Sequence, residues 1–165
     1  KPDLILLHLH SGSTALVIRQ ARDQNIALPI LAGSAMHQPT TAALLEPKQL
    51  AGVCAESASS PISEPEGPVE DFTSEYRARF GAEPDAFALA QYDGATMMIA
   101  ARNSGAKTAE EVRDWLANNS YDGLAMTYKS DGKGNMAHDA VIVCYDGKSA
   151  VPAIKRRYEN VSGVK

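Results

Sequence analysis

Polar side chains that could hold a small anion follow two short apolar segments near the start of the chain. His10, Ser11 and Gly12 come after the first segment, and the stretch 33–38 (GSAMHQ) follows the second. Imidazole and hydroxyl groups donate hydrogen bonds, and a glycine lets backbone amides approach a ligand closely. A helix that begins here would add the positive end of its dipole. These residues could bind a carboxylate, although the simpler interpretation of Ser11–Thr14 taken alone is a helix cap.

A metal site is the alternative use of the same region. His8 and His10 alternate along a predicted strand, so their rings share one face and could bind a metal together with His37. No Asp or Glu lies beside them, and donation from His10 to an anion is the simpler use of an imidazole. We therefore expect no metal or other cofactor, and we keep a metal-assisted hydrolase built on the three histidines as the enzyme alternative.

Other catalytic patterns are absent from the sequence. There is no Gly-x-Ser-x-Gly segment, and no cysteine stands beside a histidine. Cys54 and Cys144 lie far apart without CxxC or Cys/His spacing, so neither a zinc site nor a disulfide framework can be inferred. A cysteine commonly serves as a small buried apolar residue. We expect both cysteines to be buried free thiols, and a disulfide between them is the less favoured alternative.

Short strands and helices must position the two polar segments. Residues 3–9 and 28–32 are apolar runs typical of strands covered on both faces. Between them, Thr14, Val17, Ile18 and Ala21 follow helical spacing. With a short helix from Pro39 to a stop at Pro47 and a third strand at 52–59, the order is β-α-β-α-β, which predicts a parallel sheet. Ligands collect beyond the carboxyl ends of such strands, so both polar segments should border one crevice.

The rest of the chain predicts a second group of elements. The Pro-rich stretch 61–68 is a loop at which the chain passes to another body. Helices are expected next and strands last, with Gly-rich turns between the strands. The expected helices cover 69–80, 86–103 and a segment that opens on the capping box 108–111, and the expected strands cover 124–129, 140–145 and 151–157.

Composition excludes several classes of protein. The 165 residues include 16 Lys and Arg against 20 Asp and Glu, and a net charge of −4 argues against a nucleic-acid partner. The longest apolar runs fall far short of the ~20 residues of a membrane-spanning helix. The chain opens on Lys-Pro-Asp without an initiator Met or a signal segment. We interpret it as a piece of something larger.

The order of these segments resembles a known family. Its most specific motifs are IRQAR at 18–22, the stretch 76–86 (YRARFGAEPDA) and Tyr92-Asp93-Gly94. Together they resemble the carboxyl-terminal half of the solute-binding proteins of branched-chain amino acid ABC transporters, over nearly the whole chain. The resemblance implies an α/β, type I periplasmic binding protein fold that is incomplete and holds parts of both lobes. Residues 1–60 would belong to the second lobe, 61–68 to a crossing loop, 69–120 to helices of the first lobe, and 121–165 to a crossing and the terminal strands.

The resemblance also implies a function and partners. The chain would be a periplasmic, non-enzymatic component of an ABC importer that captures a small-molecule ligand and presents it to a membrane permease. A ligand sensor or regulator with the same fold is the alternative. Since parallel-sheet edges would be left uncovered, the resemblance implies either a missing amino-terminal half or self-association.

The ligand is predicted from how this chain departs from the family. There, the loop that matches 34–36 often supplies an acidic side chain for the ligand's α-ammonium, and here it holds no carboxylate. A buried ammonium without a counter-charge is costly, which favours a carboxylate without the amine, such as an aromatic acid. Imidazole and thioether groups contact a ring readily. The predicted ligand contacts are His10, Ser11, Gly12, Ser34, Ala35, Met36, His37, Phe87 and Gln91.

Overall fold

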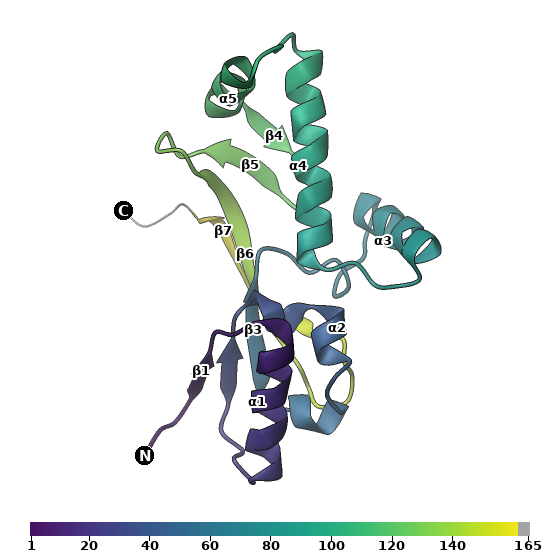
Figure 1. Ribbon diagram of the computed structural model, residues 1–165, viewed down its shortest axis with the longest axis vertical. Helices are drawn as coiled ribbons and strands as arrows, with labels where there is room; N and C mark the ends of the chain where they lie inside the picture. The colour runs from purple at the N-terminus through teal and green to yellow at the C-terminus, as the bar shows by residue number, and fades with distance from the viewer. Residues whose placement is uncertain (162–165) are drawn as a thin grey trace.

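Three short strands and the helices that connect them form one end of the molecule, which we call the sheet body (Figure 1). The protein is described by a computed structural model, of which residues 1–161 are described here. The elements of the sheet body are β1 (Ile5–Leu7), α1 (Ser11–Asp23), β2 (Ile30–Ala32), the 3-10 helix η1 (Ser34–His37), α2 (Pro39–Ala42), the 3-10 helix η2 (Pro47–Leu50) and β3 (Val53–Ser57).

The other end, which we call the helical body, contains three helices and two short strands (Figure 1). Two long strands then run between the bodies and join them. The elements are α3 (Pro68–Phe80), α4 (Ala86–Asn103), α5 (Ala109–Asn118), β4 (Ser120–Asp122), β5 (Thr127–Ser130), and the joining strands β6 (Met136–Cys144) and β7 (Ala153–Val161). No helix within 1–161 is long and apolar enough to cross a membrane.

All strands belong to one sheet with the order β1-β2-β3-β6-β5-β4, and β7 pairs with β6. β1, β2 and β3 are parallel, as the sequence predicts, whereas the later strands pair antiparallel. The first residues of β6 pair with β5 and its last residues pair with β3. β6 is therefore the strand that holds the two bodies in one sheet.

The main core lies between the sheet and α1. Alternate residues of each strand face it, because successive side chains on a strand point to opposite faces. Ile18 of α1 is completely buried against these strand residues. Tyr145, directly after β6, is buried in the same core. The strand residues in this core include Leu7, Ile30, Ala32, Val53, Ala55, Val141 and Val143.

Two local predictions about elements are wrong. The expected helix 39–46 ends at Ala42, and Pro47 begins η2 where a stop was expected. Proline suits the first position of a helix, and here Glu46 and Gln49 complete a capping box around it. β4 was not predicted, because three polar residues carry no strand pattern; they form a strand by pairing with β5. The capping box at Thr108 and Glu111 is confirmed.

The prediction of two free thiols is also wrong, because Cys54 and Cys144 form a disulfide. They lie directly opposite each other on the antiparallel strands β3 and β6, with their Cα atoms 4.0 Å apart. This register arises from long-range strand pairing, which the spacing of the two cysteines in the sequence does not reveal.

Candidate functional site

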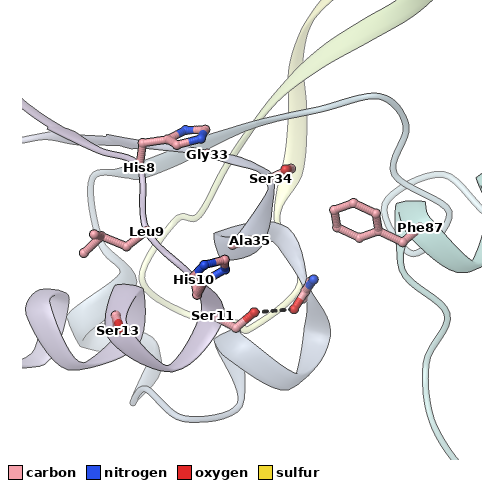
Figure 2. Close-up of a pocket in the computed structure, with 10 residues that line it drawn as sticks. His8, Leu9, His10, Ser11, Ser13, Gly33, Ser34, Ala35 and Phe87 are labelled. Atoms are coloured by element: carbon pink, nitrogen blue, oxygen red, sulfur yellow. Dashed lines mark hydrogen bonds between the residues drawn. The ribbon is translucent and has the colours of Figure 1, made fainter.

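A cavity of about 500 Å³ lies where the carboxyl ends of β1 and β2 face the start of α4 (Figure 2). Two walls come from the sheet body, one from the loop that leads into α1 and one from the loop that leads into η1. Phe87 is the lining residue from the helical body. The lining residues are His8, Leu9, His10, Ser11, Ser13, Gly33, Ser34, Ala35, Gln38 and Phe87.

The first wall is the start of α1. His10 holds the N-cap position with extended backbone and makes no side-chain cap bond, so the first amides of the helix are left without a side-chain acceptor. The Ser11 hydroxyl donates to Gln38 Oε1 at 2.5 Å and does not cap the helix (Figure 2). The cap interpretation of Ser11 is therefore wrong. A helix start with free amides beside an imidazole can receive an anion.

The second wall depends on a glycine. A Cβ atom at Gly33 would lie 2.8 Å from Nδ1 of His8, so only glycine allows the His8 ring to lie against this loop. Figure 2 shows that ring above Gly33. The next amide, that of Ser34, donates to Oε1 of Glu56 on β3 at 3.0 Å, which fixes the loop to the neighbouring strand.

The third wall is the aromatic ring of Phe87, in the first turn of α4. The Asp85 carboxylate caps this helix by accepting a hydrogen bond from the Ala88 amide at 2.8 Å. In Figure 2 the Phe87 ring projects toward the loops of the sheet body. Phe87 is 49 % exposed. A flat apolar group thus faces the polar walls.

The structure brings together some of the predicted contacts and separates others. His10, Ser11, Ser34, Ala35 and Phe87 line the cavity, whereas Gly12, Met36, His37 and Gln91 do not. Met36 is completely buried in the core, and its carbonyl accepts a hydrogen bond from the Tyr145 hydroxyl at 3.1 Å. The loop continues as a 3-10 helix, whose tight turn directs residues 36 and 37 inward.

Further lining residues lie in or directly beside the two predicted segments but were not chosen as contacts. They are His8, Leu9, Ser13, Gly33 and Gln38. The alternation that puts His8 on the same face as His10 could have identified it, but it was used only for the metal hypothesis. No pattern in the sequence indicates that the Gln38 side chain accepts a hydrogen bond from Ser11.

The three histidines are not brought together. His8 and His10 line the cavity, while His37 is buried outside it. Within the described part of the chain, no group of three acidic, histidine or cysteine side chains is placed to hold a metal ion. Neither ring nitrogen of His37 has a hydrogen-bond partner there, and burial lowers its pKa to about 4, against an opposing effect of Asp85. His37 is therefore neutral at pH 7 and carries no positive charge that could pair with an anion.

Burial of neutral His37 predicts a pH-dependent stability. The unfolded chain takes up a proton near the ordinary pKa of 6.5, and the folded chain does so only near 4. The contribution of neutral His37 to the free energy of unfolding is therefore complete above pH 6.5. It is lost as the pH falls toward 4, and the loss amounts to about 3 kcal/mol. Urea unfolding at pH 7, 5.5 and 4 should show this loss. In the variant His37→Leu, the free energy of unfolding should depend less on pH. His138→Gln, at an exposed site, is the control; an unchanged slope in the His37 variant would refute the assignment.

Comparisons with known proteins bear on the family and the fold of the chain. A family model described as "periplasmic binding protein" matches residues 1–155. No curated protein sequence matches the chain. Among solved structures, the branched-chain amino acid transporter substrate binding protein LivJ from Streptococcus pneumoniae, in complex with isoleucine, is 24 % identical with a TM-score of 0.78; the match covers 96 % of this chain and 44 % of that one.

Two further solved structures have the same fold. The leucine binding protein LivK from Thermotoga maritima is 21 % identical with a TM-score of 0.80, and the match covers 96 % of this chain and 45 % of that one. An ABC transporter solute binding protein from R. palustris, in complex with benzoate, is 15 % identical with a TM-score of 0.75, over 94 % of this chain and 43 % of that one. The chain thus spans less than half the length of these proteins, and it has the type I periplasmic binding fold.

Proposed function

The chain belongs to the periplasmic binding protein family, and on that basis we propose that it forms part of the solute-binding component of an ABC importer. It captures its ligand without transforming it and is not an enzyme. Its location is periplasmic, and its partner is a membrane permease that receives the ligand. The family match supports this proposal, and so does the fold shared with a branched-chain amino acid transporter substrate binding protein and a leucine binding protein.

The observation that carries the proposal is the cavity between the two bodies. Its volume of about 500 Å³ is in the range of small-molecule sites. Its walls come from both bodies, so a ligand bound there would contact both and favour their approach. The ranges 1–60, 61–68, 69–120 and 121–165 remain our proposed division; the passage of the chain from β3 to α3 supports the first boundary.

We propose that the ligand is a carboxylate without an α-amine, with an aromatic acid as the best candidate. Among residues 1–161 no Asp or Glu lines the cavity, so an ammonium group would be buried there without a counter-charge from them. His10 and the amides at the start of α1 suit a carboxylate, and the Phe87 ring suits an apolar or aromatic body. Met36 and His37 no longer contribute to this argument, since neither lines the cavity.

Calorimetric titration of the complete polypeptide tests the ligand class. We expect benzoate to bind and leucine not to bind, because only leucine brings an ammonium. Phe87→Ala should weaken benzoate binding about tenfold, since loss of a ring contact costs about 1.4 kcal/mol. Phe80→Ala is the matched control, because Phe80 is exposed on α3 and does not line the cavity. Tight leucine binding, or equal effects of the two substitutions, would overturn the assignment.

A further inference from the structure

Two polar side chains of the cavity bond to each other instead of capping the helices on which they stand. Ser11 is the first residue of α1, and Gln38 holds the N-cap position of α2. Neither helix has a side-chain hydrogen bond at its N-cap. The Ser11 hydroxyl donates to Gln38 Oε1, as the dashed line beside Ser11 in Figure 2 marks. Both polar groups are thus committed to the contact between the two walls of the sheet body.

This bond determines which end of the Gln38 carboxamide is available to a ligand. Oε1 accepts from Ser11, so the Nε2 group, which carries two donor hydrogens, is on the branch that points away from that hydroxyl. Within residues 1–161, Nε2 donates to no other protein group. Gln38 lines the cavity and is partly buried. The wall of the cavity therefore holds a pair of unused neutral donors.

The Nε2 group lies beside the other donors of the cavity. Because Ser11 begins α1, its bond to Gln38 places the carboxamide at the amino end of that helix. There the first backbone amides lack a side-chain acceptor, and the positive end of the helix dipole favours an anion. A hydrogen bond to a charged acceptor is stronger than one to a neutral acceptor. A carboxylate that binds at the start of α1 is thus within the region served by Gln38.

We propose that Gln38 is a specificity-determining residue of the ligand site and that Ser11 positions it. Gln38 Nε2 donates to the ligand's carboxylate, and the Ser11 hydroxyl holds the carboxamide so that Nε2, and not Oε1, faces the ligand. The site then selects a carboxylate over the corresponding carboxamide, because the NH2 group of a carboxamide ligand would meet a donor at Gln38. This inference rests on the proposed function, in which the ligand is a carboxylate.

Calorimetric titration of the complete polypeptide with benzoate and with benzamide tests the role of Gln38. The two probes share the ring and differ only in the group that Nε2 would meet. Gln38→Leu should weaken benzoate binding about tenfold and benzamide binding by less than about twofold. Gln38→Glu should weaken benzoate binding about 100-fold, because it sets one carboxylate against another, and should leave benzamide binding intact. Gln91→Leu is the matched control, since Gln91 is exposed on α4 and does not line the cavity.

Ser11→Ala tests the positioning role separately. Without the hydroxyl, the Gln38 carboxamide can turn Oε1 toward the ligand, so the ratio of benzoate affinity to benzamide affinity should fall about fivefold. Ser11→Thr retains a hydroxyl and should restore the wild-type ratio. Ser13→Ala is the control, because Ser13 lines the same cavity and makes no bond to Gln38. A residue that only stabilised the fold would change both affinities together and leave their ratio unchanged.

The outcomes distinguish a failure of this inference from a failure of the proposed function. If the wild-type protein binds benzoate and Gln38→Leu leaves that affinity unchanged, or weakens both probes equally, the role of Gln38 is wrong and the ligand class stands. A wild-type affinity ratio in Ser11→Ala would reject the positioning role of Ser11. If the wild-type protein does not bind benzoate, the proposed ligand class fails, and the role of Gln38 fails with it.

Discussion

Reduction of the Cys54–Cys144 disulfide is expected to lower the free energy of unfolding by about 4 to 5 kcal/mol. The bridge joins residues 90 positions apart, so it removes the entropy of a long loop from the unfolded chain. Its position adds to the effect, because it connects β3 to β6, the strand that joins the two bodies. Without the bridge, the β3–β6 pairing depends on backbone hydrogen bonds and on packing of residues such as Val143.

Urea unfolding with and without a phosphine reductant measures this loss. The double variant Cys54→Ser/Cys144→Ser should match the reduced wild-type protein and should not respond to the reductant. A single serine variant is unsuitable, because it would leave one reactive thiol. Coincident unfolding curves for oxidised and reduced wild-type protein would contradict the prediction and would show that the strand pairing alone holds β6 in place.

The parallel core could be predicted because its signals are local. Apolar runs at 3–9 and 28–32, with a helix of regular spacing between them, determine a β-α-β unit whose handedness and sheet type follow from general rules. The same reasoning placed His10 and Ser34 at neighbouring strand ends, where both line one cavity. It failed where the direction of a side chain depends on the type of turn, as for Met36 in a 3-10 helix.

Long-range pairing accounts for the other failures. The disulfide requires the register between β3 and β6, and β4 exists only because β5 lies beside it. Gln38 approaches Ser11 because α2 folds back toward α1. None of these contacts has a counterpart in the spacing of residues. Tyr92-Asp93-Gly94 was noted only as a motif of the resemblance, and its physical role becomes visible in the structure.

Asp93 is the buried carboxylate that fixes α4 to the segment leading into β5. Its Oδ1 accepts a hydrogen bond from the Leu124 amide at 2.7 Å, and its Oδ2 accepts from the Ala125 amide at 2.8 Å and the Tyr128 hydroxyl at 3.0 Å. Asp93 is completely buried. A Cβ at Gly123 would lie 2.5 Å from Oδ2, so the backbone can approach this closely only at a glycine. α4 also carries Phe87 into the cavity, which links this anchor to the ligand site.

Asp93→Ala should lower the free energy of unfolding by about 3 to 5 kcal/mol, because it leaves three partly buried donors without their acceptor. Asp93→Asn should cost less, since its amide oxygen still accepts one of these bonds. Burial and the Asp93 carboxylate both raise the pKa of Tyr128, so each substitution should move that pKa downward in an ultraviolet titration.

Asp114→Ala is the matched control for this prediction. Asp114 lies on α5 with 63 % of its side chain exposed, and its ion pair with Arg113 is a surface contact. Its loss should change stability by less than about 0.5 kcal/mol. If Asp93→Ala unfolded at the same urea concentration as Asp114→Ala, the three hydrogen bonds would contribute nothing net. In that case α4 would be held by apolar packing of Leu89 and Met97 alone, and the position of Phe87 would not depend on the carboxylate.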